Sequence, residues 1–299
     1  MSITVVGSVA LDTVETPWGR NEDGLGGAAV YFALAAANFT PVHMVGVVGD
    51  DFPDRHMQLL AAKGIDLTGL EHASGATFRW SGRYHEDVNI RDTLDTQLNV
   101  FEQFHPSIPE TARTAELLFL GNIHPALQAE VLAQTRPRFV AMDTMNLWIA
   151  TTPDALRAVL REVDAIVIND GEARQLTGEA NVVAAARQVQ ALGPRIVVVK
   201  KGEHGAMLFT EADAVFAIPA LPLKTVVDPT GAGDSFAGGF LGCVAQSGDT
   251  SSATLRRAVA YGTVVASFTC EAFGPARLAE IGPADIEARA ALLRRLSEF

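Results

Sequence analysis

The sequence contains few cysteines and no residue pattern typical of a zinc site. Its two cysteines, Cys243 and Cys270, lie in apolar segments that we interpret as helices, and neither belongs to a CxxC motif. We therefore expect both to pack in the core. The seven histidines are scattered, without an HExxH motif or a Cys/His cluster, which argues against structural zinc.

Signals for export and repetition are also missing. The segment Met1–Val6 has neither the basic start nor the small-residue cleavage site of a secretory signal. We find no internal repeat and no low-complexity tract. With so little cysteine, these features predict a protein of the reducing cytoplasm.

Basic residues are in the minority. The formal net charge is −12, with 35 acidic and 23 basic residues and no run of Lys or Arg. Binding to nucleic acid or to an anionic membrane is therefore not expected. An acidic protein can still bind ATP, because a divalent cation accompanies the nucleotide and backbone N–H groups at a helix start hold phosphates. A small-molecule ligand fits this charge balance.

One stretch without charge has the length of a membrane span. Residues 24–49 contain no Asp, Glu, Lys or Arg. Asn38, Thr40, Pro41 and His43 fall within this stretch, however, and they would be costly in lipid. We predict instead a buried helix that ends near Phe39, followed by a strand over residues 42–48.

Short apolar runs rich in β-branched residues alternate with longer segments of helical character. The strands are expected at residues 3–9, 42–48, 117–120, 139–142, 165–168 and 196–199. Helices are expected at about 26–39, 52–63, 126–134, 153–162, 182–192, 232–246, 252–270 and 283–296. This alternation predicts an α/β fold in which a mainly parallel sheet lies between two helical layers. We predict that residues 1–299 form a single domain.

Two polar and aromatic segments interrupt this rhythm, at about residues 12–23 and 74–101. The second contains the alternating string Thr77-Phe78-Arg79-Trp80-Ser81-Gly82-Arg83-Tyr84. We interpret both as strands of a small sheet inserted in the core that closes over a ligand as a lid. The alternative is a surface hairpin without a binding role, in which Trp80 and Tyr84 only pack.

The strongest local signal is the string Val226 to Phe240, which contains Gly231-Ala232-Gly233-Asp234. A strand end leads into a turn of small residues, and the turn opens an apolar helix. The glycines let the backbone approach a ligand, and the N–H groups of the first helical turn favour an anion. Asp234 in the same turn can accept a proton from a hydroxyl that attacks a phosphate. The simpler alternative is a tight turn in which Asp caps the helix.

This string resembles the C-terminal signature of the ribokinase-like (PfkB) family, Asp-Thr-x-Gly-Ala-Gly-Asp. The resemblance implies a three-layer α/β/α sandwich with a small β-sheet lid and a kinase that uses ATP and Mg²⁺. Asp234 then corresponds to the catalytic base, and Gly231, Ala232 and Gly233 to the anion hole. Pro229 replaces the first Thr of the pattern and removes a hydroxyl and an N–H. This change weakens the case for a monovalent cation in the turn.

Further matches to the family concern the phosphate acceptor. Gly26-Gly27 resembles the di-glycine that contacts the acceptor, and Asp12 matches the aspartate that binds acceptor hydroxyls. Tyr31 stands where the family commonly has Asn, so we place it in the substrate site as an aromatic replacement. This replacement favours a nucleoside or cyclic polyol acceptor over a simple sugar. A sugar, a polyol and a nucleoside all remain possible acceptors.

Other matches concern the nucleotide. Asn169 and Glu172 fit the family motif Asn-x-x-Glu, whose glutamate orients magnesium through water. Lys201 and Gly202 belong to a string that resembles the strand and turn beside the nucleotide, and Thr230 belongs to the phosphate turn. Lid strands of this kind sometimes pair across a dimer, so a homodimer through the lid is expected by analogy.

Other functions fit the sequence less well. Residues 24–29 satisfy the dinucleotide pattern G-x-G-x-x-A, but the polar residues 17–23 before them cannot form the buried strand that this pattern requires. The chain has no P-loop string G-x-x-x-x-G-K-[ST] and no G-x-S-x-G elbow. A non-catalytic sensor that binds a nucleoside or sugar on a kinase-like fold is the remaining alternative.

Overall fold

The computed structural model describes residues 1–210 and 214–298. Within these residues, nine strands form one sheet in the order β13-β12-β11-β10-β9-β8-β1-β4-β5. The strands from β11 to β5 in this order run parallel, and β12 and β13 add an antiparallel edge. The strands are β1 (Ile3–Val6), β4 (Val42–Val48), β5 (Asp66–His72), β8 (Leu117–Leu120), β9 (Phe139–Met142), β10 (Ala165–Asn169), β11 (Ile196–Lys200), β12 (Ala206–Phe209) and β13 (Val215–Ile218).

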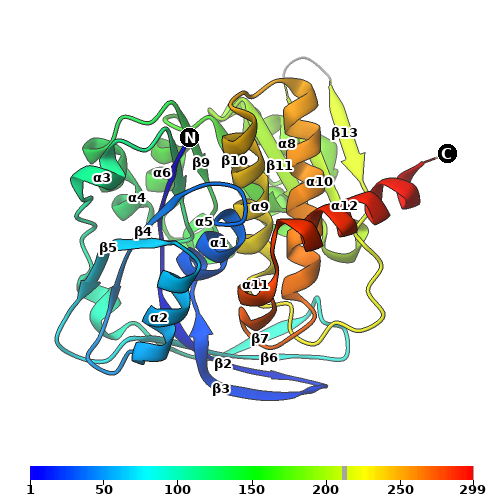
Figure 1. Ribbon diagram of the computed structural model, residues 1–299. Coiled ribbons are helices and arrows are strands. Elements are labelled where there is room, and N and C mark those ends of the chain that lie inside the picture. The colour runs from blue at the N-terminus through cyan, green and yellow to red at the C-terminus, as the bar shows by residue number, and fades with distance from the viewer. Residues whose placement is uncertain (211–213, 299) are drawn as a thin grey trace.

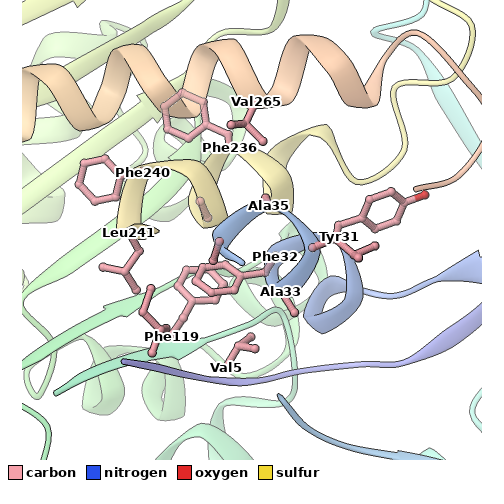
Figure 2. Packing of buried hydrophobic residues seen from close by; sticks show 14 of the residues in the cluster. Val5, Tyr31, Phe32, Ala33, Ala35, Phe119, Phe236, Phe240, Leu241 and Val265 are labelled. Atoms are coloured by element: carbon pink, nitrogen blue, oxygen red, sulfur yellow. The ribbon is translucent and has the colours of Figure 1, made fainter. Parts of the chain in front are cut away.

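Both faces of this sheet are buried, because its side chains alternate between two cores. In β8, Leu117 and Phe119 belong to one apolar cluster, and Leu118 and Leu120 belong to the other. Phe119 stacks on Phe32 with 4.2 Å between ring centroids, which ties the sheet to helix α1 (Figure 2). The predicted three-layer sandwich with a mainly parallel sheet is therefore confirmed.

The helices divide between the two faces. Helices α1, α2, α9, α10, α11 and α12 contribute to the cluster that contains Phe119, and α3 to α8 contribute to the other (Figure 1). Their bounds are α1 (Ala28–Ala36), α2 (Asp54–Ala62), α3 (Glu110–Arg113), α4 (Pro125–Gln134), α5 (Asn146–Thr151), α6 (Pro153–Leu160), α7 (Asp170–Thr177), α8 (Val182–Ala191), α9 (Ala232–Ser247), α10 (Ser252–Thr269), α11 (Ala276–Glu280) and α12 (Pro283–Ser297).

A second sheet of four strands has the order β3-β2-β6-β7. Its strands are β2 (Ala10–Thr16), β3 (Gly19–Gly26), β6 (Phe78–Tyr84) and β7 (Arg91–Gln97), and a 3₁₀ turn, η1 (Asn99–Gln103), follows. The segments that we interpreted as a lid, 12–23 and 74–101, contain most of these strands. Figure 1 shows this sheet beneath the main body, next to the end where α9 begins. We call it the lid; its closing over a ligand stays a prediction.

Several bounds differ from those expected. The first strand ends at Val6 rather than at residue 9, because the chain crosses from the main sheet into the lid strand β2. The uncharged residues 24–49 contain α1 and β4, with all of α1 buried. Among the described residues, no helix is both long and apolar enough to cross a bilayer.

Candidate active site

Three neighbouring parallel strands deliver polar side chains to one edge of the main sheet. Asp143 follows β9 directly, while Asn169 ends β10 and Lys200 ends β11. Asn169 and Lys200 are register partners, so they stand side by side. Ligands of open α/β sheets bind beyond the carboxyl ends of the strands, which makes this edge the place to look for a site.

The phosphate turn, residues 228–234, lies at the same edge. Asp228 is fully buried, and its two carboxylate oxygens accept hydrogen bonds from Thr230 N (2.9 Å) and Gly274 N (3.0 Å). Gly231 precedes α9 with φ of 75°, a conformation that favours glycine. The N–H of Ala232 already donates to the Pro229 carbonyl at 3.1 Å. The buried Asp228 carboxylate thus holds the turn in place. The start of α9 faces the carboxyl ends of the strands.

Tyr31 packs against the phosphate turn. Its side chain is 2% exposed, and a Cβ atom added at Gly231 would clash with its ring. Figure 2 shows Tyr31 at the edge of the core, with its hydroxyl directed away from Phe32. Burial, reinforced by the charges of Asp228 and Asp12, raises the pKa of Tyr31 well above its ordinary value. Tyr31 therefore supports the turn, and its direct contact with a substrate stays a prediction.

A buried lysine lies against the first turn of α9. Lys200 Nζ is 3.2 Å from Asp143 Oδ2 in a pair whose side chains are 17% and 7% exposed. A Cβ atom added at Gly233 would lie 2.9 Å from Lys200 Nζ. Burial alone would lower the pKa of Lys200, but Asp143, Glu172 and Asp234 together raise it. The lysine is therefore held as a cation at the start of the helix.

Asp234 stands in the first turn of α9. Burial is the main cause that raises its pKa to about 7, the charge of Asp143 adds to this, and Lys200 opposes it. Burial and Asp143 together outweigh Lys200 and a backbone hydrogen bond, both of which lower the pKa of Asp234. A carboxyl group with this pKa is near its midpoint at neutral pH and suits a general base.

Asn169 and Glu172 form a capping box at the start of α7. Asn169 Oδ1 accepts from Glu172 N at 2.7 Å, and Glu172 Oε2 accepts from Asn169 N at 3.0 Å. Burial, followed by the charge of Asp143, raises the pKa of Glu172 to about 7. Over the described residues, no group of three or more His, Cys, Asp or Glu side chains is arranged to hold a metal ion alone.

Asp12 lies on lid strand β2 but faces the core. It is 7% exposed, and its pKa rises to about 7 through burial first and then through Asp228, with a smaller contribution from Asp234. A side chain at Gly26 would clash with the Asp12 carboxylate. Gly27 has φ of 96° and packs on the Ser8 carbonyl. The two glycines thus allow Asp12 to pack closely against the start of α1.

Lid strands β6 and β7 bring aromatic and basic groups to the same place. The Thr230 hydroxyl donates to the Tyr84 hydroxyl at 3.2 Å, so the lid touches the phosphate turn. Trp80 is the register partner of Asp12, and the Arg91 guanidinium lies 5.1 Å from the centre of the Trp80 ring. Asp12, Trp80 and Arg91 therefore form one group on the lid.

A pocket of about 600 Å³ adjoins the start of α9. Its polar end includes Asn169, Lys200 and Gly202, and the edge of the phosphate turn contributes Ala232 and Gly233. Its apolar side consists of Leu221, Leu223, Val226, Phe236, Ala266 and Cys270. A nucleotide needs both a polar end for phosphates and an apolar slot for its base, so we call this the nucleotide pocket.

Of the five residues that the sequence suggested for the nucleotide, two line the pocket, and Glu172 is among the three that do not. Asn169 and Gly202 line the pocket, whereas Lys201 and Thr230 are not among its lining residues. The lysine at the pocket is Lys200, which we did not select, and Asp143 was also missed. Both follow apolar strand runs, and the pairing of Lys200 with Asn169 in adjacent strands was the available signal.

Comparisons with known proteins agree with this geometry. The family model described as pfkB family carbohydrate kinase matches residues 2–281. The cytidine kinase of Thermococcus kodakarensis is 33% identical over 248 residues, which cover 81% of this chain and 87% of that protein.

Two solved structures share the fold. The Burkholderia thailandensis nucleoside kinase in complex with inosine superposes with a TM-score of 0.78 at 21% identity, covering 97% of this chain and 98% of that one. A putative ribokinase II from E. coli, in complex with ATP and Mg²⁺, has a TM-score of 0.80 at 20% identity, covering 97% and 99%. The chain therefore belongs to the pfkB family of carbohydrate kinases, which are ATP-dependent phosphotransferases.

Proposed function

We propose that this protein transfers the γ-phosphate of ATP to the hydroxymethyl group of a nucleoside. The observation that carries the proposal is the position of Asp234. Its carboxyl group stands in the first turn of α9, where its charge raises the pKa of Asp12 on one side and the pKa of Lys200 on the other. Asp12 belongs to the lid side of the site and Lys200 to the nucleotide pocket. Asp234 thus lies between the two substrates.

The lid side holds the acceptor. Asp12 accepts hydrogen bonds from hydroxyl groups of the sugar ring, and Gly27 lets the ring approach the backbone. Trp80 offers an aromatic face to a nucleobase, and such contacts contribute about 0.5–1.5 kcal/mol beyond area burial. The name of the Thermococcus relative, cytidine kinase, makes cytidine the first acceptor to test.

The nucleotide pocket holds ATP. The base enters the apolar side, and the phosphates lie at the polar end beside Lys200 and Asn169. The N–H groups of Gly231 and Gly233, at the positive end of α9, bind the transferred phosphoryl group. The Ala232 N–H contributes less than the sequence suggested, since it is engaged with Pro229.

Chemistry proceeds by in-line displacement. The acceptor oxygen forms a bond to the γ-phosphorus while the bond from that phosphorus to the bridging oxygen of ADP breaks, and Asp234 takes the hydroxyl proton. Lys200 and the N–H groups of the turn stabilise the charge that develops on the phosphoryl oxygens. These groups act in a buried site, where electrostatic stabilisation is strong.

Magnesium fits the residues at this edge of the sheet. Mg²⁺ in nucleotide sites binds through phosphates, waters and one or two carboxylates, so an all-protein cage is not required. Glu172 and Asp143 are the carboxylates that would hold its waters, with Asn169 beside them. When bound, Mg²⁺ neutralises charge on the phosphates. A cytoplasmic location and a lid-mediated homodimer stay predictions, and Pro229 still argues against a monovalent-cation site in the turn.

A panel assay tests the proposed function. ATP consumption is measured with cytidine, uridine, adenosine, inosine, ribose, 2-deoxyribose, fructose and myo-inositol, with Asp234→Asn as the background control. We expect turnover with at least one nucleoside, and phosphate on its hydroxymethyl oxygen by ³¹P NMR. Turnover with free sugars alone contradicts the nucleoside acceptor. Binding of nucleosides without ATP consumption supports the non-catalytic sensor instead.

A further inference from the structure

The loop that joins β6 to β7 has a defined shape. We call residues 85–90 the lid tip. His85 N donates to Ile90 O at 3.1 Å and Ile90 N donates to Asp87 O at 2.9 Å. Asp87 Oδ1 accepts from the backbone N of Asn89 at 2.9 Å and from its side-chain Nδ2 at 3.0 Å. The tip is therefore a hydrogen-bonded turn, which presents its side chains in fixed directions.

The lid tip lies at the nucleotide pocket, although the rest of the lid faces the acceptor side. Val88 and Asn89 are both among the residues that line the pocket. Val88 is half-buried, while Glu86, Asp87 and Ile90 around it are exposed. Figure 1 shows the β6–β7 hairpin extending beneath α11 toward the segment that precedes α9.

The tip also approaches the strand-end loop of the main sheet. A Cβ atom added at Gly202 would lie 2.8 Å from Asn89 Oδ1, so the tip is in contact with the loop that follows β11. Gly202 follows Lys200 and stands at the polar end of the pocket. Asn89 is therefore near the phosphate and ribose end of a bound nucleotide. An amide suits that end, because it offers both a donor and an acceptor.

The residues that flank the tip connect the same hairpin to the phosphate turn and to the acceptor side. Tyr84, the last residue of β6, accepts from Thr230 in the phosphate turn, and Arg91, the first residue of β7, lies over Trp80. Only the six residues of the tip separate these anchors from each other along the chain. A shift of the hairpin therefore moves the contacts at both substrates together.

We infer that the lid tip is part of the nucleotide site: Val88 covers the bound nucleotide and the Asn89 amide contacts its ribose or phosphates. This inference rests on the proposed function. It also implies that ATP and the acceptor favour the same lid position. Each substrate should then raise the affinity for the other by the same factor, as thermodynamic linkage requires.

Nucleotide binding alone provides the test, so that no acceptor need be known. Isothermal titration calorimetry with Mg-AMP-PNP is applied to the wild type, to the double variant Val88→Ala/Asn89→Ala, and to Glu86→Ala, an exposed residue of the same tip that does not line the pocket. The double variant is expected to bind roughly fivefold more weakly, the size of one lost hydrogen bond. Glu86→Ala is expected to bind as the wild type does.

Hydrogen–deuterium exchange gives a second readout on the wild type. Saturating Mg-AMP-PNP should slow exchange in a peptide that spans the lid tip. Equal affinity in the double variant together with unchanged exchange overturns the inference and leaves the proposed function intact. A wild type that does not bind Mg-AMP-PNP at all overturns both. A variant that has unfolded is recognised by its circular dichroism spectrum, and the exchange result on the wild type then decides.

Discussion

We call the phosphate turn, together with Asp143 and Lys200, the phosphate end of the site. Two ion pairs of almost equal length show how it differs from the lid. Lys200 and Asp143 lie 3.2 Å apart with side chains 17% and 7% exposed. Arg83 and Glu15 of the lid lie 3.1 Å apart with side chains 49% and 40% exposed. Water and salt screen the second pair, whereas the first acts in a medium of lower dielectric constant. We therefore propose that the charges at the phosphate end take part in the chemistry.

For the lid we propose a role in recognition of the acceptor instead. Strand β7 is exposed along its whole length, so its side chains can change without disturbing a core. At the phosphate end, by contrast, Gly231 packs on the buried ring of Tyr31. This contrast suggests that substitutions at the phosphate end lower turnover, and that substitutions in the lid change which acceptor is bound.

The largest effect should come from Asp234→Asn. The amide cannot take the hydroxyl proton, and general-base assistance is worth about 10² to 10⁴ in rate. We expect kcat to fall at least about a hundredfold while Mg-AMP-PNP affinity, measured by calorimetry, stays near the wild-type value. Near-normal turnover in this variant would remove Asp234 from the role of base.

Lys200→Met should have the next largest effect. Hydrogen bonds to charged groups contribute about 1.5–3 kcal/mol, which predicts a fall in kcat of roughly thirtyfold. Arg83→Met is the matched control, because it removes a cation from an exposed pair; it should leave kcat within about twofold. Equal losses in the two variants would contradict the contrast between buried and exposed pairs.

The sequence predicted the phosphate turn and the layered fold because both depend on local patterns. The spacing of Gly231, Gly233 and Asp234 and the alternation of apolar runs are readable along the chain. Lys200 and Asp143 were missed because their importance arises from strand pairing, which brings together residues 57 positions apart. Tyr31 was noticed as unusual, but its packing on Gly231 joins segments that only the folded chain makes neighbours.

Low pH should inactivate the enzyme through protonation of Asp234. Burial raises the pKa of Asp234 to about 7, and only the ionised form accepts a proton. The ionised fraction grows as pH rises through this value, so kcat/KM should increase about tenfold from pH 6 to pH 8. Steady-state rates across this range, with stability checked at each pH, provide the measurement. A flat profile would show that substrates see an Asp234 already ionised at pH 6.

Trp80→Ala should alter acceptor binding by a smaller factor. Loss of an aromatic partner for a nucleobase predicts a rise in acceptor KM of roughly fivefold with little change in the KM for ATP. Trp18→Ala is the control, because Trp18 lies in the turn that joins β2 to β3 of the same sheet and is 60% exposed. If kcat falls and both KM values stay constant, Trp80 acts on the chemistry. The proposed difference in role between the lid and the phosphate end would then be wrong.

Asp12 tests where the buried region of the site ends, because it belongs to a lid strand yet is buried like the core. Its pKa rises from about 3.8 in the unfolded chain to about 7 in the fold. The folded state therefore binds the proton more tightly, and this contribution to stability is lost as pH rises toward 7. Asp12→Asn removes the buried charge. The unfolding temperature of the variant minus that of the wild type should therefore be roughly 3 °C larger at pH 8 than at pH 5. Thermal scans at both pH values measure this difference. An equal shift at the two pH values would mean that Asp12 is as well solvated as the rest of the lid.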